Sequence, residues 1–331
     1  MPSKKPQSLS PLEVEIKRWV RDLSGDIVRT KIMALDYVLD GGIRTGRILE
    51  IFGPEQSGKT TVMLHIAKAF LESRKGRVVY IDTEHALDER WAKLNGLDLS
   101  DERVVLIQPS STNEALTIAE RLCRYPEVSL IVLDSLPALA LEEELQAEDY
   151  HSVQPGLLAR AFNRTLRILT SALPQNQSVF VFSNQLRSSM SPYGAAETTP
   201  GGRMKNYSAS YRLEIRKKDW IGTKQNATGI VSTIRAVKNK CGQPYRSAEV
   251  FITSQGLDLA RSNFEMLVML GLIQRNGSYY TLNGKSMRKE DLTAYMLEHA
   301  DELYAKFLEA LEAMNREGVE GDTQEIAEDQ E

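Results

Sequence analysis

Eight consecutive residues, 53–60, have the types and spacing that bind a nucleoside triphosphate. They read G-P-E-Q-S-G-K-T and match the phosphate-binding pattern G-x-x-x-x-G-K-[ST] in full. In such a loop the backbone N–H groups face the phosphates, Lys59 supplies a cation to the β- and γ-phosphates, and Thr60 supplies a hydroxyl to Mg²⁺. The flanks predict a strand over 47–52 and a helix over 61–69, which is the setting that the loop needs. The nucleotide-binding candidates here are Gly53, Pro54, Glu55, Gln56, Ser57, Gly58, Lys59, Thr60 and Thr61.

Two acidic residues at the ends of predicted strands could complete the chemistry. Asp134 ends the apolar run 130–134, the usual place for a carboxylate that holds Mg²⁺; a turn at the end of a buried strand is the alternative. Glu84 follows the run 78–82, so it is expected at the carboxyl edge of the sheet, beside the phosphates. There it could orient the attacking water, or it could instead cap the helix that follows.

The bulk composition describes a soluble globular chain. Of 331 residues, 42% are hydrophobic and 26% are charged. No apolar run approaches the roughly 18 residues of a membrane helix, and the polar N-terminus lacks the apolar core of a secretory signal. Cys123 and Cys241 have no metal-type spacing and are expected to be free thiols. These features predict a cytoplasmic protein with no membrane partner.

The net charge of −4 conceals an uneven distribution. Residues 312–331 hold eight acidic residues and one arginine, a net charge of −7, so the other 311 residues sum to +3. This acidic segment contains few large apolar side chains, which predicts a disordered tail on a slightly basic body.

The remaining pattern predicts an α/β protein. Near-continuous apolar runs at 78–82, 104–108, 130–134 and 179–183 alternate with helical stretches, which is typical of a mainly parallel sheet covered by helices. Three later runs, 211–216, 230–239 and 248–253, are expected to extend one edge as antiparallel strands. We expect an N-terminal arm with an amphipathic oligomerisation helix in 1–25, an ATPase core in 26–258, a small α/β domain in 259–311 with one long helix over 292–311, and the tail in 312–331.

Two basic regions are candidates for nucleic-acid binding. The segment 187–218 starts as a Gly-rich loop, carries a net charge of +5 and includes Tyr193 and Tyr207, a combination that suits single-stranded nucleic acid. A solvated charged loop is the equal alternative. In the second region, Arg160, Arg164 and Arg167 share one face of a predicted helix without a compensating acid in the helix. A polar outer face is the alternative there.

Taken together, the residues resemble the bacterial RecA recombinases, in order and spacing, over about 25–258. The phosphate loop alone indicates only an NTPase, whereas the acidic and glycine-rich strings are far more specific. The matching strings are 53–61, D-T-E-H-A-L-D at 82–88, D-S at 134–135, N-Q-L-R at 184–187, E-T-T-P-G-G at 197–202 and V-K-N-K at 237–240.

The resemblance implies a RecA-like P-loop ATPase core with ATP and Mg²⁺ as cofactors. It implies a helical homopolymer on single-stranded DNA that pairs it with homologous double-stranded DNA in recombination, DNA repair and the SOS response. Single-strand-binding and loader proteins belong to such a system. By resemblance, the catalytic residues are Glu84, Lys59 and Gln185, the last sensing the γ-phosphate, and the metal ligands are Thr60 and Asp134. Further nucleotide contacts are Asp88 and Trp91 at the base, and Lys238 and Lys240 from the neighbouring protomer. The implied DNA loops are 144–155 and 188–203, and the implied DNA-facing residues are Arg160, Asn163, Arg167, Arg187, Gly201, Gly202 and Arg203.

Several residues depart from the family pattern. Trp91 stands where tyrosine is usual, Tyr193 where phenylalanine is typical, and Asn206-Tyr207 where Lys-Phe is usual. Such departures suit a divergent or bacteriophage-encoded member. Two other functions use a similar core: a hexameric helicase, which the E-T-T-P-G-G loop disfavours, and a filament-forming or non-catalytic regulatory ATPase, which intact Lys59 and Glu84 disfavour.

Overall fold

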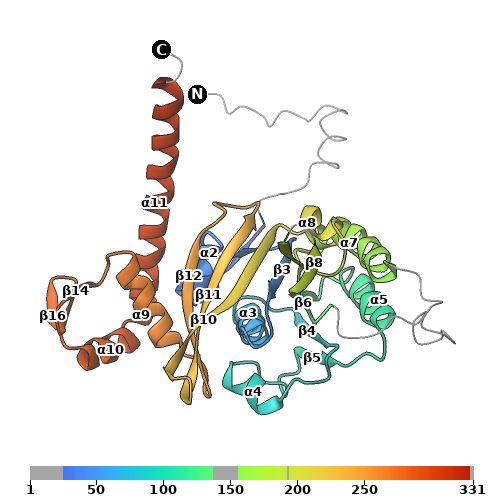
Figure 1. Cartoon of the computed structure of the whole chain (residues 1–331), viewed down its shortest axis with the longest axis horizontal. Coiled ribbons are helices and arrows are strands. Elements are labelled where there is room, and N and C mark those ends of the chain that lie inside the picture. The colour runs from blue at the N-terminus through green and yellow to red at the C-terminus, as the bar shows by residue number, and fades with distance from the viewer. Residues whose placement is uncertain (1–24, 137–155, 192–193, 329–331) are drawn as a thin grey trace, which may run out of the picture.

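The computed structural model describes residues 25–136, 156–191 and 194–328 (Figure 1). The predicted oligomerisation helix and the predicted first DNA loop therefore lie outside the described residues, as does Tyr193. None of the helices described is long and apolar enough to cross a membrane.

A nine-stranded sheet forms the centre of the molecule. Its strand order is β13-β12-β11-β10-β3-β7-β6-β4-β5. The strands from β10 to β5 are parallel, and β11, β12 and β13 extend the other side with antiparallel pairs. The bounds are β3 Ile48–Gly53, β4 Arg77–Asp82, β5 Val104–Ile107, β6 Val128–Asp134, β7 Val179–Gln185, β10 Tyr211–Thr223, β11 Asn226–Asn239, β12 Ser247–Thr253 and β13 Gly256–Leu257. The predicted mainly parallel α/β fold is confirmed, with β10 pairing in parallel with β3 and antiparallel with β11.

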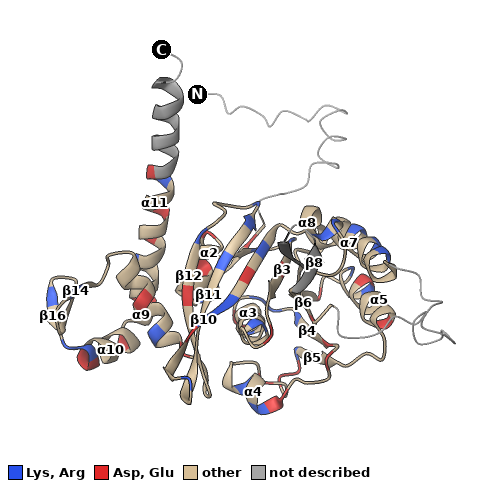
Figure 2. Ribbon diagram, in the orientation of Figure 1, with Lys and Arg blue, Asp and Glu red and all other residues tan. Residues whose placement is uncertain are grey.

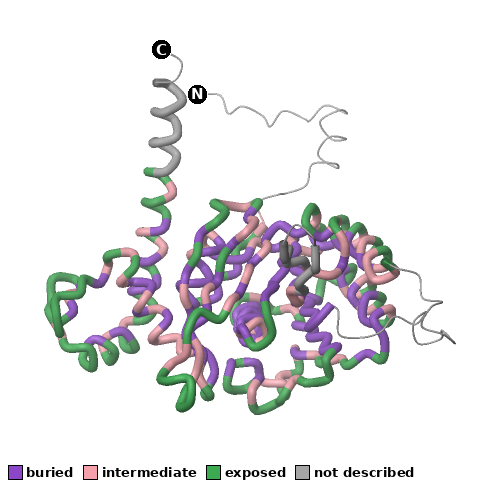
Figure 3. Tube along the Cα trace, viewed as in Figure 1, coloured by how far each residue is buried: buried purple, intermediate pink, exposed green. Residues whose placement is uncertain are grey.

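Two apolar layers cover the sheet, as the alternation of side chains on buried strands requires. On β6, Leu130 and Val132 belong to the layer with α3 (Lys59–Ser73) and α2 (Met33–Val38), while Ile131 and Leu133 belong to the layer with α5 (Thr112–Leu122) and α7 (Leu157–Asn176). Buried segments accordingly run through the middle of the molecule (Figure 3). Two short helices flank the sheet, α4 Glu89–Leu94 and α8 Met204–Ser208. A separate two-stranded sheet pairs β1 Ile27–Val28 antiparallel with β2 Ile43–Arg44, and α2 lies between these strands in the chain.

The C-terminal region packs on the same core. It comprises α9 Leu259–Met269, the three-stranded sheet β14 Gln274–Asn276, β15 Tyr279–Leu282 and β16 Lys285–Met287, then α10 Lys289–Glu298 and α11 Ala300–Glu328. Strands β15 and β16 pair antiparallel, from Tyr280 with Met287 to Leu282 with Lys285. Phe264, Phe307 and Leu311 join the same apolar cluster as α2 and α3, so the core is continuous from the nine-stranded sheet to the C-terminal helices.

Three expectations about local structure differ from what is observed. The single helix predicted over 292–311 is two helices, because α10 ends at His299, whose φ of −114° and ψ of 27° leave the helical region. The helix α11 then continues to Glu328, through the segment expected to be disordered, and its C-terminal part projects from the body in Figure 1. Glu, Ala, Met and Gln favour helix there, and Arg316 lies 3.6 Å from Glu312 one turn earlier.

The predicted flexible basic loop is instead a hairpin. Strand β8 (Arg187–Ser191) pairs antiparallel with β9 (Gly194–Thr198), from Arg187 with Thr198 to Ser191 with Gly194. This short ribbon carries no apolar alternation, so periodicity could not reveal it.

Candidate nucleotide and DNA site

The phosphate loop lies between β3 and α3 as the sequence predicts. Strand β3 ends at Gly53 and helix α3 begins at Lys59, with Gly58 in the left-handed conformation at φ 97°. A Cβ on Gly53 would lie 1.9 Å from Ile215 O, and one on Gly58 would lie 2.3 Å from Ile252 Cδ1. Both positions therefore require glycine, Gly58 on two grounds.

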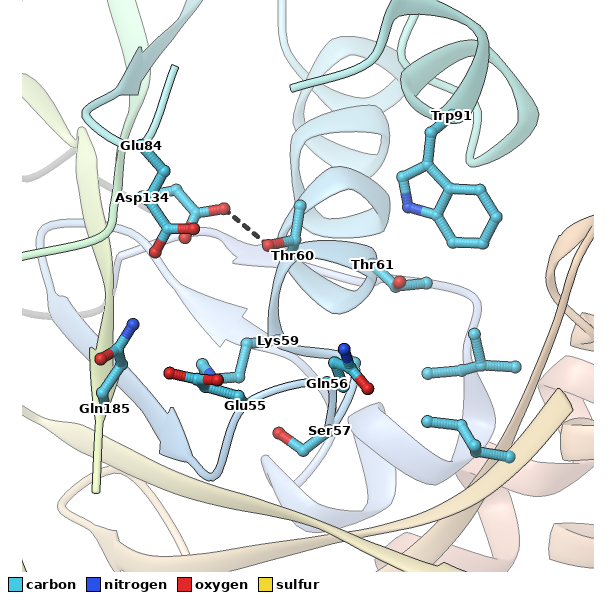
Figure 4. Close-up of a pocket in the computed structure, with 13 residues that line it drawn as sticks. Glu55, Gln56, Ser57, Lys59, Thr60, Thr61, Glu84, Trp91, Asp134 and Gln185 are labelled. Atoms are coloured by element: carbon cyan, nitrogen blue, oxygen red, sulfur yellow. Dashed lines mark hydrogen bonds between the residues drawn. The ribbon is translucent and has the colours of Figure 1, made fainter. Parts of the chain in front are cut away.

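The loop forms one wall of a cavity of about 580 Å³ (Figure 4). Acidic, basic, amide and apolar side chains from several strands and helices meet there. Its lining residues are Glu55, Gln56, Ser57, Gly58, Lys59, Thr60, Thr61, Glu84, Trp91, Asp134, Gln185, Ile230 and Ile252. The structure thus brings together the predicted loop, both predicted carboxylates and Gln185, within a volume that suits a small-molecule ligand.

Lys59 is the cation of this cavity. Its Nζ donates to Pro54 O at 2.7 Å and to Gly53 O at 3.2 Å, so the ammonium is folded back over the loop. Burial lowers the pKa of Lys59, and the charges of Asp134, Glu84 and Glu55 oppose that shift. A ligand anion placed in the loop would offset the same desolvation penalty.

Asp134 sits at the floor of the cavity and accepts three hydroxyl hydrogen bonds. Thr60 Oγ1 and Tyr80 OH donate to its Oδ2, each at 2.8 Å, and Ser183 Oγ donates to its Oδ1 at 2.6 Å. Burial raises the pKa of Asp134, and the three donors counter that rise. A carboxylate and a hydroxyl so placed fit Mg²⁺, which takes one or two carboxylates together with phosphate oxygens.

Sequence reasoning missed Tyr80 and Ser183. Tyr80 is fully buried, and burial together with the Asp134 charge raises its pKa well above the usual range, so it stays a donor. Both residues lie on strands that flank β6, which only the strand order reveals.

Glu84 is held at the cavity by a neighbour of Asp134. Ser135 Oγ donates to Glu84 Oε1 at 2.7 Å, and Thr83 Oγ1 donates to Ser135 O at 2.6 Å. The alternative role of helix cap belongs to Asp88, whose carboxylate accepts from Trp91 N at 2.7 Å at the start of α4. Glu84 is therefore left exposed toward the cavity (Figure 4).

Gln185 and Asn184 connect the cavity to the glycine-rich turn at 200–202. Gln185 lines the cavity at the end of β7. The Nδ2 of Asn184 donates to Pro200 O at 3.0 Å and to Glu50 Oε1 at 3.1 Å. Glu50 is fully buried and pairs with Arg212, whose Nε lies 2.5 Å from its Oε2. One residue before Gln185, the chain is thus hydrogen-bonded to Pro200, in the turn that precedes α8.

The predicted DNA-facing residues gather around α7 and that turn. A Cβ on Gly201 would lie 3.1 Å from Phe162 Cδ1, and one on Gly202 would lie 3.1 Å from Ala159 Cβ, so both glycines pack on α7. Asn163 lies beside Gly202, and its buried Oδ1 has no hydrogen-bond partner among the described residues. Three arginines, Arg160, Arg167 and Arg203, are exposed, and Arg187 begins β8. Basic residues mark α7 in Figure 2.

The arginine stripe on α7 is partly compensated, contrary to expectation. Arg164 Nη2 lies 3.6 Å from Glu120 Oε2, and Glu120 also accepts from Thr165 Oγ1 at 2.7 Å. The acid comes from α5, a helix distant in sequence, so inspection of 156–169 alone could not find it.

Two predicted nucleotide contacts do not line the cavity of their own chain. Lys240 Nζ donates to Tyr207 O at 2.7 Å, and Lys238 Nζ donates to Asn206 O. Burial lowers the pKa of Lys238 to about 8, with repulsion from Lys240 and Arg212 adding to it. Of the two residues expected at the base, Trp91 lines the cavity, and Asp88 lines a smaller adjoining hollow.

Comparison with known proteins agrees with this geometry. The family model described as RecA N-terminal domain matches residues 19–258. The protein named Protein RecA from Tropheryma whipplei is 38% identical over 295 residues, covering 86% of this chain and 66% of its own length. Protein RecA from Acidothermus cellulolyticus is 38% identical over 296 residues, which cover 86% of this chain and 84% of the relative. Protein RecA from Chloroherpeton thalassium is 36% identical over 306 residues, which cover 89% of this chain and 84% of the relative. This chain belongs to the RecA family.

Proposed function

We propose that this chain is an ATP-dependent homologous recombinase that polymerises on single-stranded DNA and exchanges it with homologous duplex. The observation that carries the proposal is the convergence of Lys59, Glu84 and Asp134 with Gln185 in one cavity, whose rim is tied through Asn184 to the glycine-rich turn. Membership of the RecA family supports the same function.

The cavity residues can divide the work of ATP hydrolysis. Lys59 and the N-terminus of α3 would bind the phosphates, and Thr60 and Asp134 would hold Mg²⁺, which would supply positive charge at the phosphates. Glu84, exposed and fixed by Ser135, orients the attacking water and accepts its proton. Gln185 contacts the γ-phosphate, and the adjacent Asn184, bonded to Pro200 O, transmits that contact to the turn at 200–202.

The DNA would lie along α7 and the hairpin β8–β9. Exposed Arg160, Arg167 and Arg203 supply charges to phosphates, and the close packing of Gly201 and Gly202 on α7 lets backbone approach the strand. Neutralised phosphates release counterions, so binding is expected to weaken steeply with salt.

Assembly would complete the nucleotide site. Lys238 and Lys240 lie away from the cavity of their own chain, which fits a role at the nucleotide of a neighbouring protomer. The segment 1–24 is proposed to pack on that neighbour.

One experiment separates the proposal from its alternatives. The full chain is imaged with a non-hydrolysable ATP analogue and single-stranded DNA, and homologous pairing is then assayed. Helical filaments that pair strands support the recombinase. Closed rings that unwind forks would indicate a helicase, and filaments without pairing would indicate a regulatory ATPase.

A further inference from the structure

Helix α4 carries Trp91 to the nucleotide cavity but is too short to hold its own position. It spans six residues, and its described tertiary anchors are few: Ala92 is buried and Trp91 packs partly against the core. A helix of this length is not stable in isolation, so the position of the indole depends on the contacts at the ends of α4.

Asn95, the residue that ends α4, makes those contacts. It is fully buried, its Nδ2 donates to Trp91 O at 2.8 Å, and its Oδ1 accepts from Leu257 N at 3.1 Å. One amide therefore joins the turn that carries Trp91 to strand β13 of the central sheet. Gly256 permits the approach, since a Cβ there would lie 2.9 Å from Asn95 Oδ1.

His65 lies near Asn95, on the helix of the phosphate loop. It is one turn beyond Thr61, is 8% exposed, and its buried Nε2 has no hydrogen-bond partner among the described residues. Burial lowers the pKa of His65 to about 4, so the imidazole is neutral at ordinary pH. The Asn95 amide thus connects α4 and β13 behind the wall of the cavity that Trp91, Thr61, Ile230 and Ile252 form.

We propose that Asn95 is a positioning residue for the nucleotide base. It holds the indole of Trp91 at the cavity, and the position of the indole determines the affinity for the base. This inference rests on the proposed ATP-binding function. An aromatic face and two isoleucines form a slot that suits the π-face of a base, while the loop binds the phosphates independently. Asn95 therefore acts on one end of the ligand only.

The test compares ATP with inorganic tripolyphosphate, which lacks the base. Asn95→Leu keeps the branched shape of the side chain and removes both side-chain hydrogen bonds, and Asn95→Ala, which is smaller, is the second variant. Both are expected to weaken ATP binding about tenfold, the size of one base–aromatic stacking interaction, and to leave tripolyphosphate affinity unchanged. At saturating ATP the hydrolysis rate is expected to stay near that of the unaltered protein.

A double-mutant cycle with Trp91→Ala asks whether Asn95 acts through the indole. In the Trp91→Ala background, Asn95→Leu is expected to have no further effect on ATP affinity. The matched control is Asn176→Leu, since Asn176 makes the same kind of contact at the end of α7, donating to Cys123 O at 2.9 Å, far from the cavity lining. Thermal unfolding of each variant without nucleotide identifies any that fail to fold.

The outcomes are distinguishable from failure of the proposed function. Failure of the unaltered protein to bind ATP would overturn that function. If the unaltered protein binds ATP, then equal losses for ATP and tripolyphosphate, or losses additive with Trp91→Ala, would show that Asn95 only stabilises the fold. Unchanged ATP affinity in folded Asn95→Leu and Asn95→Ala would overturn the inference by itself.

Discussion

Thr60 Oγ1 donates a 2.8 Å hydrogen bond to Asp134 Oδ2, so the first turn of the phosphate-loop helix and the end of β6 meet at one carboxylate. The two residues are 74 positions apart in sequence. Their contact brings a hydroxyl and a carboxylate together in the lining of the cavity that Lys59 and Glu84 also line (Figure 4).

Lys59→Ala should abolish ATP-dependent DNA binding and lower hydrolysis by a factor on the order of 10² or more, because the phosphates lose their positioned cation. Steady-state ATPase rates and ATP titration measure this. The matched control is Lys68→Ala on the same helix, where the ammonium lies 3.8 Å from Glu72 on the surface. Near-normal hydrolysis by Lys59→Ala would remove this cavity from the reaction.

Glu84→Gln should separate binding from chemistry. Loss of a group that accepts the proton of water is expected to slow hydrolysis by a factor on the order of 10² or more, with ATP affinity and filament formation retained. Glu89→Gln, on the exposed first turn of α4, is the control. An equal loss of ATP affinity in Glu84→Gln would mean that the carboxylate has a structural role through Ser135.

Sequence reasoning found those parts of the site that are local in the chain. The loop 53–60, Asp134 and Glu84 each follow a predicted strand, so their place at the sheet edge could be inferred. Tyr80 and Asn95 could not be found, because their roles depend on which strands and helices become neighbours. The hairpin β8–β9 was missed for a different reason, since its strands, R-S-S-M-S and G-A-A-E-T, have no regular alternation of apolar and polar residues.

Arg203→Ala should reduce both the affinity for single-stranded DNA and its dependence on salt. On a single strand, the slope of log affinity against log salt changes by about 0.7 for each phosphate that the protein no longer neutralises. Arg164→Ala is the comparison, since its guanidinium already lies 3.6 Å from Glu120. Fluorescence anisotropy over a salt series measures both, and an unchanged slope would remove Arg203 from the contact set.

Asp36 should make the stability of the fold depend on acidity between about pH 4 and pH 6. Burial raises its pKa to about 6, against hydrogen bonds from Tyr304 and Thr30. The folded protein therefore binds a proton that the unfolded chain, with a pKa of about 3.9, has released in this range. The free energy of unfolding contributed by this group is full below about pH 4 and is lost as pH rises through 6.

Asp36→Asn removes the titrating carboxyl, so comparison with this variant isolates the contribution of Asp36 to the free energy of unfolding. Urea unfolding measures the free energy of unfolding of both proteins across that range. As pH rises from about 4 to 6, this free energy should fall in the unaltered protein by up to about 3 kcal/mol more than in Asp36→Asn, because the pKa is raised by about two units. Parallel curves for the two proteins would show that Asp36 keeps an ordinary pKa.

The acidic C-terminal segment should restrain duplex DNA binding. Residues 319–331 carry six acidic and no basic side chains, and an acidic segment on the same or a neighbouring protomer competes with DNA phosphates for the basic surface. The competition is electrostatic and is screened by salt and Mg²⁺. Deletion of 319–331 should therefore raise duplex affinity most at low Mg²⁺ and least at high Mg²⁺.

The deletion must begin after Asn315, so that the packing of α11 on the core is kept and only the acidic segment is removed. Asn315 Nδ2 donates to Asp40 Oδ1 at 2.8 Å, and Arg246 Nη1 lies 2.7 Å from the same oxygen, so a shorter chain would no longer join α11 to the core at this point. A chain with the acidic residues of 319–331 replaced by Gln and Asn is the matched control for length. If duplex affinity is the same for all three proteins across the Mg²⁺ titration, the segment serves solubility alone and does not compete with DNA.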